Sequence, residues 1–104
     1  MKKQDFNDGL LGFLDVSTTP FHATRNMVMM LENAGFKRLN EEQRWDLVEG
    51  ERYFVTRNDS SLIAFTYPKR KDYTMVGCHT DSPNLKLKPD AVIKEHGVVK
   101  FGVE

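Results

Sequence analysis

The hydrophobic pattern of this sequence changes its period at Gly35. Before that glycine, apolar residues recur at helical spacing, as Phe6, Leu10, Phe13 and Leu14 do on one face. After it, short apolar or alternating runs are separated by turn residues, which is typical of β-strands. The two patterns together predict the α/β fold class, with the helices first along the chain.

A second helix is predicted between Thr19 and Gly35. Thr19 is suited to the N-cap, Pro20 to the first helical position and Gly35 to the position just past the C-terminus. The apolar stripe of this helix consists of Ala23, Met27, Met30, Leu31 and Ala34. We therefore expect a helix over residues 20–34, separated from the first helix by a short break.

Several segments after Gly35 carry strand patterns. The predicted strands are 36–39, 51–57, 61–67, 73–79, 85–88 and 98–103. The turn residues Asn58-Asp59-Ser60 predict that two of these strands form a hairpin. The segment 73–79 is expected to be a buried strand, and the basic run Lys69–Lys71 before it a solvated loop.

Composition and charge argue against several classes of protein. The 104 residues include 15 basic and 15 acidic side chains, so the net charge of zero argues against a nucleic-acid binder. No apolar run approaches the roughly 20 residues of a membrane helix. Acidic residues near the N-terminus argue against a signal peptide, and the single cysteine, Cys78, excludes an internal disulfide. These features predict a cytoplasmic protein with no membrane or nucleic-acid partner.

The alternating apolar segment 98–103 is followed only by Glu104. A strand at that place would present an unpaired apolar edge, and such edges favour association. We therefore expect the sequence to be cut from a longer protein, and we expect this portion to be marginally stable alone.

The motif with the clearest chemistry is His79-Thr80-Asp81, at the end of the predicted strand 73–79. Side chains alternate in an extended backbone, so His79 and Asp81 point to the same side and Cys78 to the other. One imidazole nitrogen can then bind a metal while the carboxylate orients the ring. The same alternation predicts that Cys78 is a small buried hydrophobic residue and not a ligand.

The spacing alone leaves a second interpretation of this motif open. A histidine can be hydrogen-bonded to a nearby turn aspartate without binding a metal. A zinc site also needs three or four protein ligands, which one histidine and one aspartate do not supply. The other histidines are poor candidates, because His22 begins the second helix and His96 lies in a polar turn.

Several short motifs follow one another in order along most of the chain. They are Ser17-Thr18-Thr19-Pro20-Phe21-His22-Ala23, Ala34-Gly35-Phe36, Leu39-Asn40-Glu41, Trp45, Tyr53, Ser60–Phe65, His79–Pro83 and Leu85–Pro89. Together they resemble the N-terminal part of the aspartyl aminopeptidase family of di-metal exopeptidases. The ordered set is more specific than any one of its motifs.

The resemblance implies a cytosolic metallo-aminopeptidase that removes N-terminal residues, often Asp or Glu, from peptides. It implies two divalent metals, commonly zinc with cobalt or manganese as alternatives, and a homo-oligomeric complete protein. In the family, the histidine matching His79 is a metal ligand, and the aspartate matching Asp81 is the site carboxylate that supports it. The other ligands and the general base lie downstream of this chain.

The fold implied by the resemblance is an α/β/α sandwich interrupted by a β-rich oligomerisation domain. Residues 1–89 then correspond to the first part of the catalytic domain, and residues 90–104 to the start of the inserted domain. A chain without most of the ligands is expected to be inactive alone. A neighbouring exopeptidase with broader preference is the alternative among enzymes. The alternative of another class is a naturally truncated, non-catalytic module that associates with full-length subunits.

Overall fold

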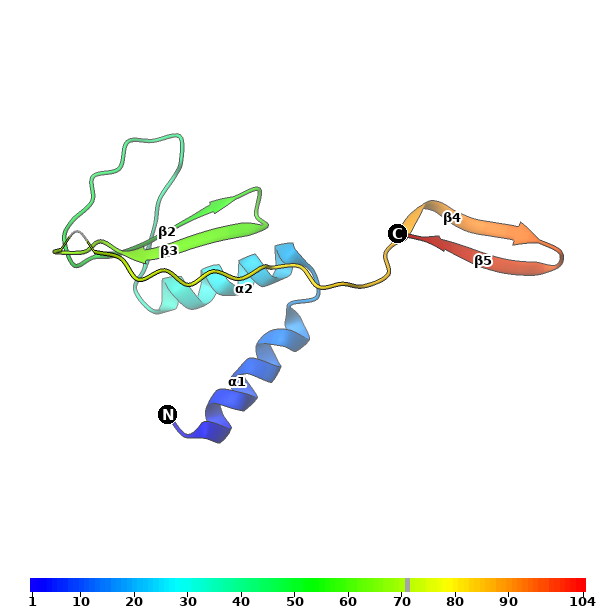
Figure 1. Ribbon diagram of the computed structural model, residues 1–104, viewed down its shortest axis with the longest axis horizontal. Coiled ribbons are helices and arrows are strands. Elements are labelled where there is room, and N and C mark those ends of the chain that lie inside the picture. Colours follow the sequence, from blue (N-terminus) through cyan, green and yellow to red (C-terminus); the bar gives the residue numbers. More distant parts are fainter. Residues whose placement is uncertain (71) are drawn as a thin grey trace.

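The computed structural model describes residues 1–70 and 72–104 of the chain. Two helices come first, followed by a three-stranded sheet and a separate two-stranded hairpin. The molecule is elongated, measuring 68 by 40 by 22 Å, with the sheet and the hairpin toward opposite ends (Figure 1). The α/β class predicted from the two hydrophobic periods is confirmed.

Both predicted helices are present. The first, α1, spans Lys3–Val16, and the second, α2, spans Pro20–Asn33. Thr19 is the N-cap of α2, and its Oγ1 accepts a hydrogen bond from the backbone N–H of His22 at 3.2 Å. Gly35, just past the helix, has a φ of +83°, a left-handed conformation that lacks steric cost only for glycine. The start and end signals in the sequence therefore identify α2 correctly.

The three-stranded sheet has the order β1-β2-β3. Strand β1, Lys37–Arg38, runs parallel to β2, Arg52–Arg57, and β2 pairs antiparallel with β3, Ser61–Thr66. In the turn between β2 and β3, Asn58 and Asp59 have φ angles of 53° and 51°, which these residue types tolerate better than most. The hairpin predicted from the turn residues is confirmed.

The buried core lies where α2 meets the sheet. Its members are Ala23, Thr24, Tyr53, Phe54 and Val55. Phe54, in the middle of β2, is completely buried, and the Tyr53 ring beside it lies 5.8 Å from the Phe65 ring, between centroids. The buried residues of the described chain therefore lie on α2 and β2, so that α2 and the sheet form the packed part of the structure.

The loop between β1 and β2 is held by polar contacts. Trp45 donates from Nε1 to the backbone oxygen of Asn40 at 2.7 Å. Glu41 and Arg57 form an ion pair, with Oε1 and Nη2 separated by 2.7 Å. The hydrogen bond from Arg57 lowers the pKa of the Glu41 carboxyl, and the same bond raises the pKa of the Arg57 guanidinium. The loop is thus tied to the end of β2.

The second hairpin consists of β4, Leu87–Glu95, and β5, Val98–Val103. Lys86 and Glu104 extend it by one pair, through reciprocal backbone hydrogen bonds of 3.1 and 2.9 Å. The predicted strand 98–103 is confirmed. The segment predicted as a strand at 85–88 contains only the beginning of β4, which starts at Leu87 and is longer than predicted.

The predicted buried strand 73–79 is wrong for this structure. Its residues are exposed and pair with no strand in the described part of the chain. Cys78, predicted to be buried, is exposed for the same reason. Strand composition favours extended backbone, but a strand also requires a neighbour that supplies hydrogen bonds. Without such a neighbour, apolar side chains such as Val76 stay in solvent.

Two further sequence predictions concern the surface of the molecule. Lys69 and Arg70, in the predicted solvated loop, are exposed, whereas Lys71 lies outside the described residues. Neither α1 nor α2, nor any other helix in the described ranges, has the length and apolar character needed to cross a membrane.

Candidate metal centre

His79 and Asp81 contact each other directly. The Nδ1 atom of His79 lies 3.0 Å from Oδ1 of Asp81 and 2.8 Å from the backbone oxygen of the same residue. The backbone here is extended without belonging to a sheet. The predicted placement of the two side chains on the same side therefore holds, although the strand from which it was argued is absent.

These contacts determine which imidazole nitrogen carries the proton. Both atoms that face Nδ1 of His79 are oxygens of acceptor groups, one a carbonyl and one a carboxylate. Nδ1 must therefore hold the proton and donate it, and the lone pair of the neutral ring lies on Nε2. A histidine whose other nitrogen donates to a carboxylate or carbonyl is the common arrangement for a metal ligand.

The His79–Asp81 pair lies open to solvent, with side-chain exposures of 79% and 76%. No group of three or more His, Cys, Asp or Glu residues in a metal-binding arrangement occurs within residues 1–70 and 72–104. A zinc site needs three or four protein ligands. The donor set present here thus fits one ligand position of such a site, with its orienting carboxylate, and leaves the other positions to be filled from elsewhere.

The other histidines and the cysteine have separate surroundings. His22 lies at the start of α2, where its Nδ1 is 2.7 Å from Oγ1 of Thr19. His96 lies in the turn between β4 and β5, with a φ of +48°. Cys78 precedes His79 but is exposed and carries a free thiol. Across the described part of the chain, none of these three side chains joins His79 in a metal-binding group.

Thr80, which lies between His79 and Asp81 in the sequence, contacts the turn between β2 and β3. Its Oγ1 donates a hydrogen bond to the backbone oxygen of Ser60, in the turn between β2 and β3, at 2.9 Å. Our sequence reasoning did not select Thr80. The alternation that puts His79 and Asp81 on one side predicts that Thr80 takes the other side, but it does not identify Ser60 as the partner.

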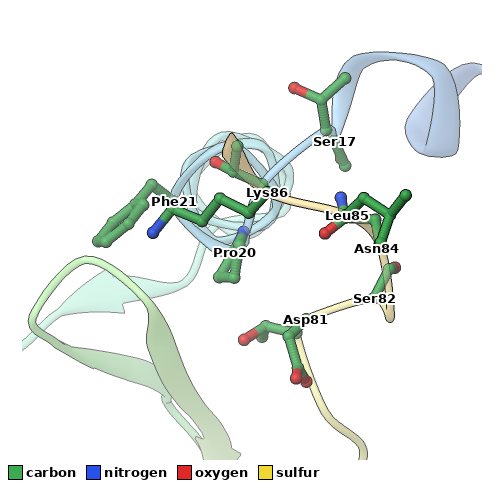
Figure 2. Close-up of a pocket in the computed structure, with 11 residues that line it drawn as sticks. Ser17, Pro20, Phe21, Asp81, Ser82, Asn84, Leu85 and Lys86 are labelled. Atoms are coloured by element: carbon green, nitrogen blue, oxygen red, sulfur yellow. The ribbon is translucent and has the colours of Figure 1, made fainter. Parts of the chain in front are cut away.

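A cavity of about 450 Å³ is lined in part by Asp81. Figure 2 shows Asp81 and Ser82 on one side of it and Pro20 and Phe21, from the start of α2, on the other. His79 is not among the lining residues. The cavity therefore adjoins Asp81 and not the His79 ring.

A family model matches most of the chain. The model described as "Aminopeptidase I zinc metalloprotease (M18)" covers residues 13–104, which include the His79–Asp81 pair. A Pseudomonas putida protein named "Probable M18 family aminopeptidase 2" is 50% identical over 102 residues, which are 94% of this chain and 24% of that protein. A protein of the same name from Pseudomonas savastanoi pv. phaseolicola is 47% identical over 98% of this chain and 25% of its own length.

Solved structures show the same relationship. The structure of Chaetomium thermophilum mApe1 matches with a TM-score of 0.76 and 31% identity, over 98% of this chain and 24% of that one. A chain in the cryo-EM structure of the Ape4 and Nbr1 complex matches with a TM-score of 0.68 and 40% identity. The match covers 90% of this chain and 20% of that one. The chain therefore spans about a quarter of the length of the relatives it matches.

Proposed function

Because the chain belongs to the M18 family of zinc aminopeptidases, we propose that the complete protein is a metallo-aminopeptidase and that this chain supplies one metal ligand. The observation that carries the proposal is the contact between His79 and Asp81. It leaves Nε2 free while the carboxylate and the backbone oxygen of Asp81 fix Nδ1. The pair also lies inside the segment that matches the family.

Each residue of the pair has its own role in this proposal. His79 would hold zinc through Nε2, and Asp81 would keep the ring correctly turned by accepting the hydrogen bond from Nδ1. When bound there, zinc would supply Lewis-acid chemistry, which polarises a carbonyl oxygen and lowers the pKa of bound water. We assign two divalent metals to the complete site, with the remaining ligands and the general base outside these 104 residues.

The substrates we propose are peptides with an acidic N-terminal residue, Asp or Glu, cleaved in the cytoplasm by a homo-oligomer. The support for these finer assignments is the family resemblance. We place residues 1–89 in the catalytic domain, an α/β/α sandwich when complete, and residues 90–104 at the start of an inserted β-rich domain. The projection of the β4–β5 hairpin away from the sheet supports a separate domain there (Figure 1).

The test of this function is peptide cleavage by the full-length protein. We expect release of N-terminal Asp and Glu from short peptides, faster than release of Ala or Leu. A chelator should abolish the release, and added zinc should restore it. His79→Ala should remove activity, whereas His96→Ala, in the exposed hairpin turn, should retain it. Cleavage that survives both chelation and His79→Ala would contradict the proposal.

The 104-residue chain alone is expected to show no such activity, because it lacks most of the ligands and the base. Metal-dependent cleavage by the purified chain, lost in His79→Ala, would show that this expectation is wrong. The alternative function is a non-catalytic module that associates with full-length subunits, favoured by the exposed β4–β5 hairpin. The intact mass of the native gene product separates the two: a mass several times 12.0 kDa supports the enzyme, and a mass near 12.0 kDa supports the module.

A further inference from the structure

We propose that Thr80 is a positioning residue, which fixes the His79–Asp81 pair relative to the sheet by anchoring it to the turn between β2 and β3. The inference rests on the proposed function, because it concerns the geometry of that metal site. Thr80 would not touch metal or substrate. It would act through the two residues that flank it.

The anchor is a single hydrogen bond with good geometry. Oγ1 of Thr80 donates to the backbone oxygen of Ser60 at 2.9 Å, and the contact is partly buried. The acceptor is itself held in place, because the backbone N–H of Ser60 donates to the Arg57 oxygen at 3.2 Å, within the turn that closes the hairpin. The Thr80 hydroxyl is thus bonded to the turn that joins β2 and β3.

In the described part of the chain, the hydrogen bonds of the pair do not reach the helices or the sheet. His79 and Asp81 are both more than three-quarters exposed, and they contact each other. Within the described residues, the bond from Thr80 to Ser60 is the one hydrogen bond that ties segment 73–85 to the helices or the sheet. The direction in which Nε2 points relative to the sheet therefore depends on this bond.

The alternation of side chains gives Thr80 this role without interference with the site. In extended backbone, the residue between two neighbours points to the opposite side. Thr80 accordingly bonds to the β2–β3 turn, while His79 and Asp81 contact each other. A precise metal site requires that its ligands are held by supporting contacts to the rest of the fold. Here His79 and Asp81 form the pair, and Thr80 makes the supporting contact.

The experiment compares three variants of the full-length protein. Thr80→Val removes the hydroxyl at nearly constant shape, Thr80→Ser keeps the hydroxyl, and Thr74→Val is the matched control, an exposed threonine on the same segment. Zinc affinity is measured by competition with a chelator, independently of turnover. We expect Thr80→Val to bind zinc about threefold to tenfold more weakly, the size of one lost hydrogen bond. Thr80→Ser and Thr74→Val should bind zinc as the unmodified protein does.

Steady-state kinetics at saturating zinc gives a second readout. A displaced ligand should lower kcat with little change in KM, and Thr80→Ser should rescue kcat. If Thr80→Val fails to fold, Thr80→Ala, which removes the hydroxyl together with the γ methyl group of threonine, takes its place.

Two outcomes would overturn the inference. Thr80→Val could equal the unmodified protein in zinc affinity and in kcat, or Thr80→Ser could lose as much as Thr80→Val. Both differ from failure of the proposed function, in which the unmodified protein itself would lack zinc-dependent aminopeptidase activity.

Discussion

At the residue scale, the Asp81 carboxylate contributes to the site by acting on an imidazole. Its Oδ1 and its backbone oxygen both accept from Nδ1 of His79, so the neutral ring presents only Nε2. An exposed pair of this kind has little effect on stability. In the proposed metal site, this contact would fix the tautomer and the angle of the His79 ring before a metal binds.

The first prediction concerns this carboxylate. Asp81→Ala in the full-length protein should weaken zinc binding by about 10- to 100-fold, because the ring loses the partner that orients it. Isothermal titration with zinc measures the change. Ser82→Ala, at the next residue and also beside the cavity, is the matched control and should leave the affinity unchanged. Equal affinities for Asp81→Ala and Ser82→Ala would contradict the assignment.

The second prediction concerns the ion pair of Glu41 and Arg57. The hydrogen bond from Arg57 holds the pKa of the Glu41 carboxyl below its ordinary value of 4.5. A lowered folded-state pKa means that the stabilisation is fully present above pH 4.5 and is lost as the pH falls through the folded value. We expect Arg57→Gln to raise the pKa of Glu41 in an NMR titration. Arg44→Gln, in the same loop, should leave it where it is, and a Glu41 pKa that does not respond to Arg57→Gln would contradict the pairing.

At the element scale, cap and turn residues in the sequence correctly predicted where helices and strands begin and end. The N-cap at Thr19, the glycine at residue 35 and the turn at 58–60 each predict a boundary that the structure confirms. The strand expected at 73–79 failed because pairing is a long-range property, and the described chain contains no strand beside it. The burial expected for Cys78 failed with that strand, since a period-2 pattern says which side a residue takes and not what covers it.

The same limit applies to the candidate site. Spacing was enough to predict that His79 and Asp81 share one side, and their contact distance bears this out. Spacing could not predict that Thr80 reaches Ser60, because the two residues are distant in sequence and meet only through the path of the chain.

The third prediction tests the start of α2. Thr19→Ala removes the hydroxyl that caps the backbone N–H of His22, and such a loss costs about 0.5–2 kcal/mol of stability. Thr18→Ala is the control, because Thr18 is exposed and caps nothing in the described structure. Denaturant unfolding of the full-length protein, followed by circular dichroism, measures both variants. A Thr18→Ala change as large as the Thr19→Ala change would contradict the capping role.

The fourth prediction tests the core of the sheet. Phe54 is fully buried, and Phe→Ala at such a site costs about 3–5 kcal/mol. In the 104-residue chain, Phe54→Ala should therefore remove the cooperative thermal transition. Ile63→Ala in β3, where the side chain is 66% exposed, should shift that transition only slightly. If Phe54→Ala retained the transition at its original temperature, the core would lie elsewhere.

At the scale of the whole molecule, the described chain has a small core and large uncovered apolar surfaces. Exposed large apolar residues lie on α1, on segment 73–85 and on both strands of the second hairpin. Many exposed large apolar side chains on one chain are typical of surfaces against which another part of a protein packs. The chain spans about a quarter of the M18 relatives, so the remainder of an M18 enzyme would supply that cover.

The central claim is that His79 is a zinc ligand, through Nε2, in the complete aminopeptidase. Anomalous diffraction at the zinc absorption edge, from crystals of the full-length protein, tests it most directly. We predict an anomalous peak roughly 2.0–2.1 Å from His79 Nε2, with Nδ1 still bonded to Asp81. A zinc peak remote from His79, or one bound to Nδ1 with Asp81 displaced, would contradict the account.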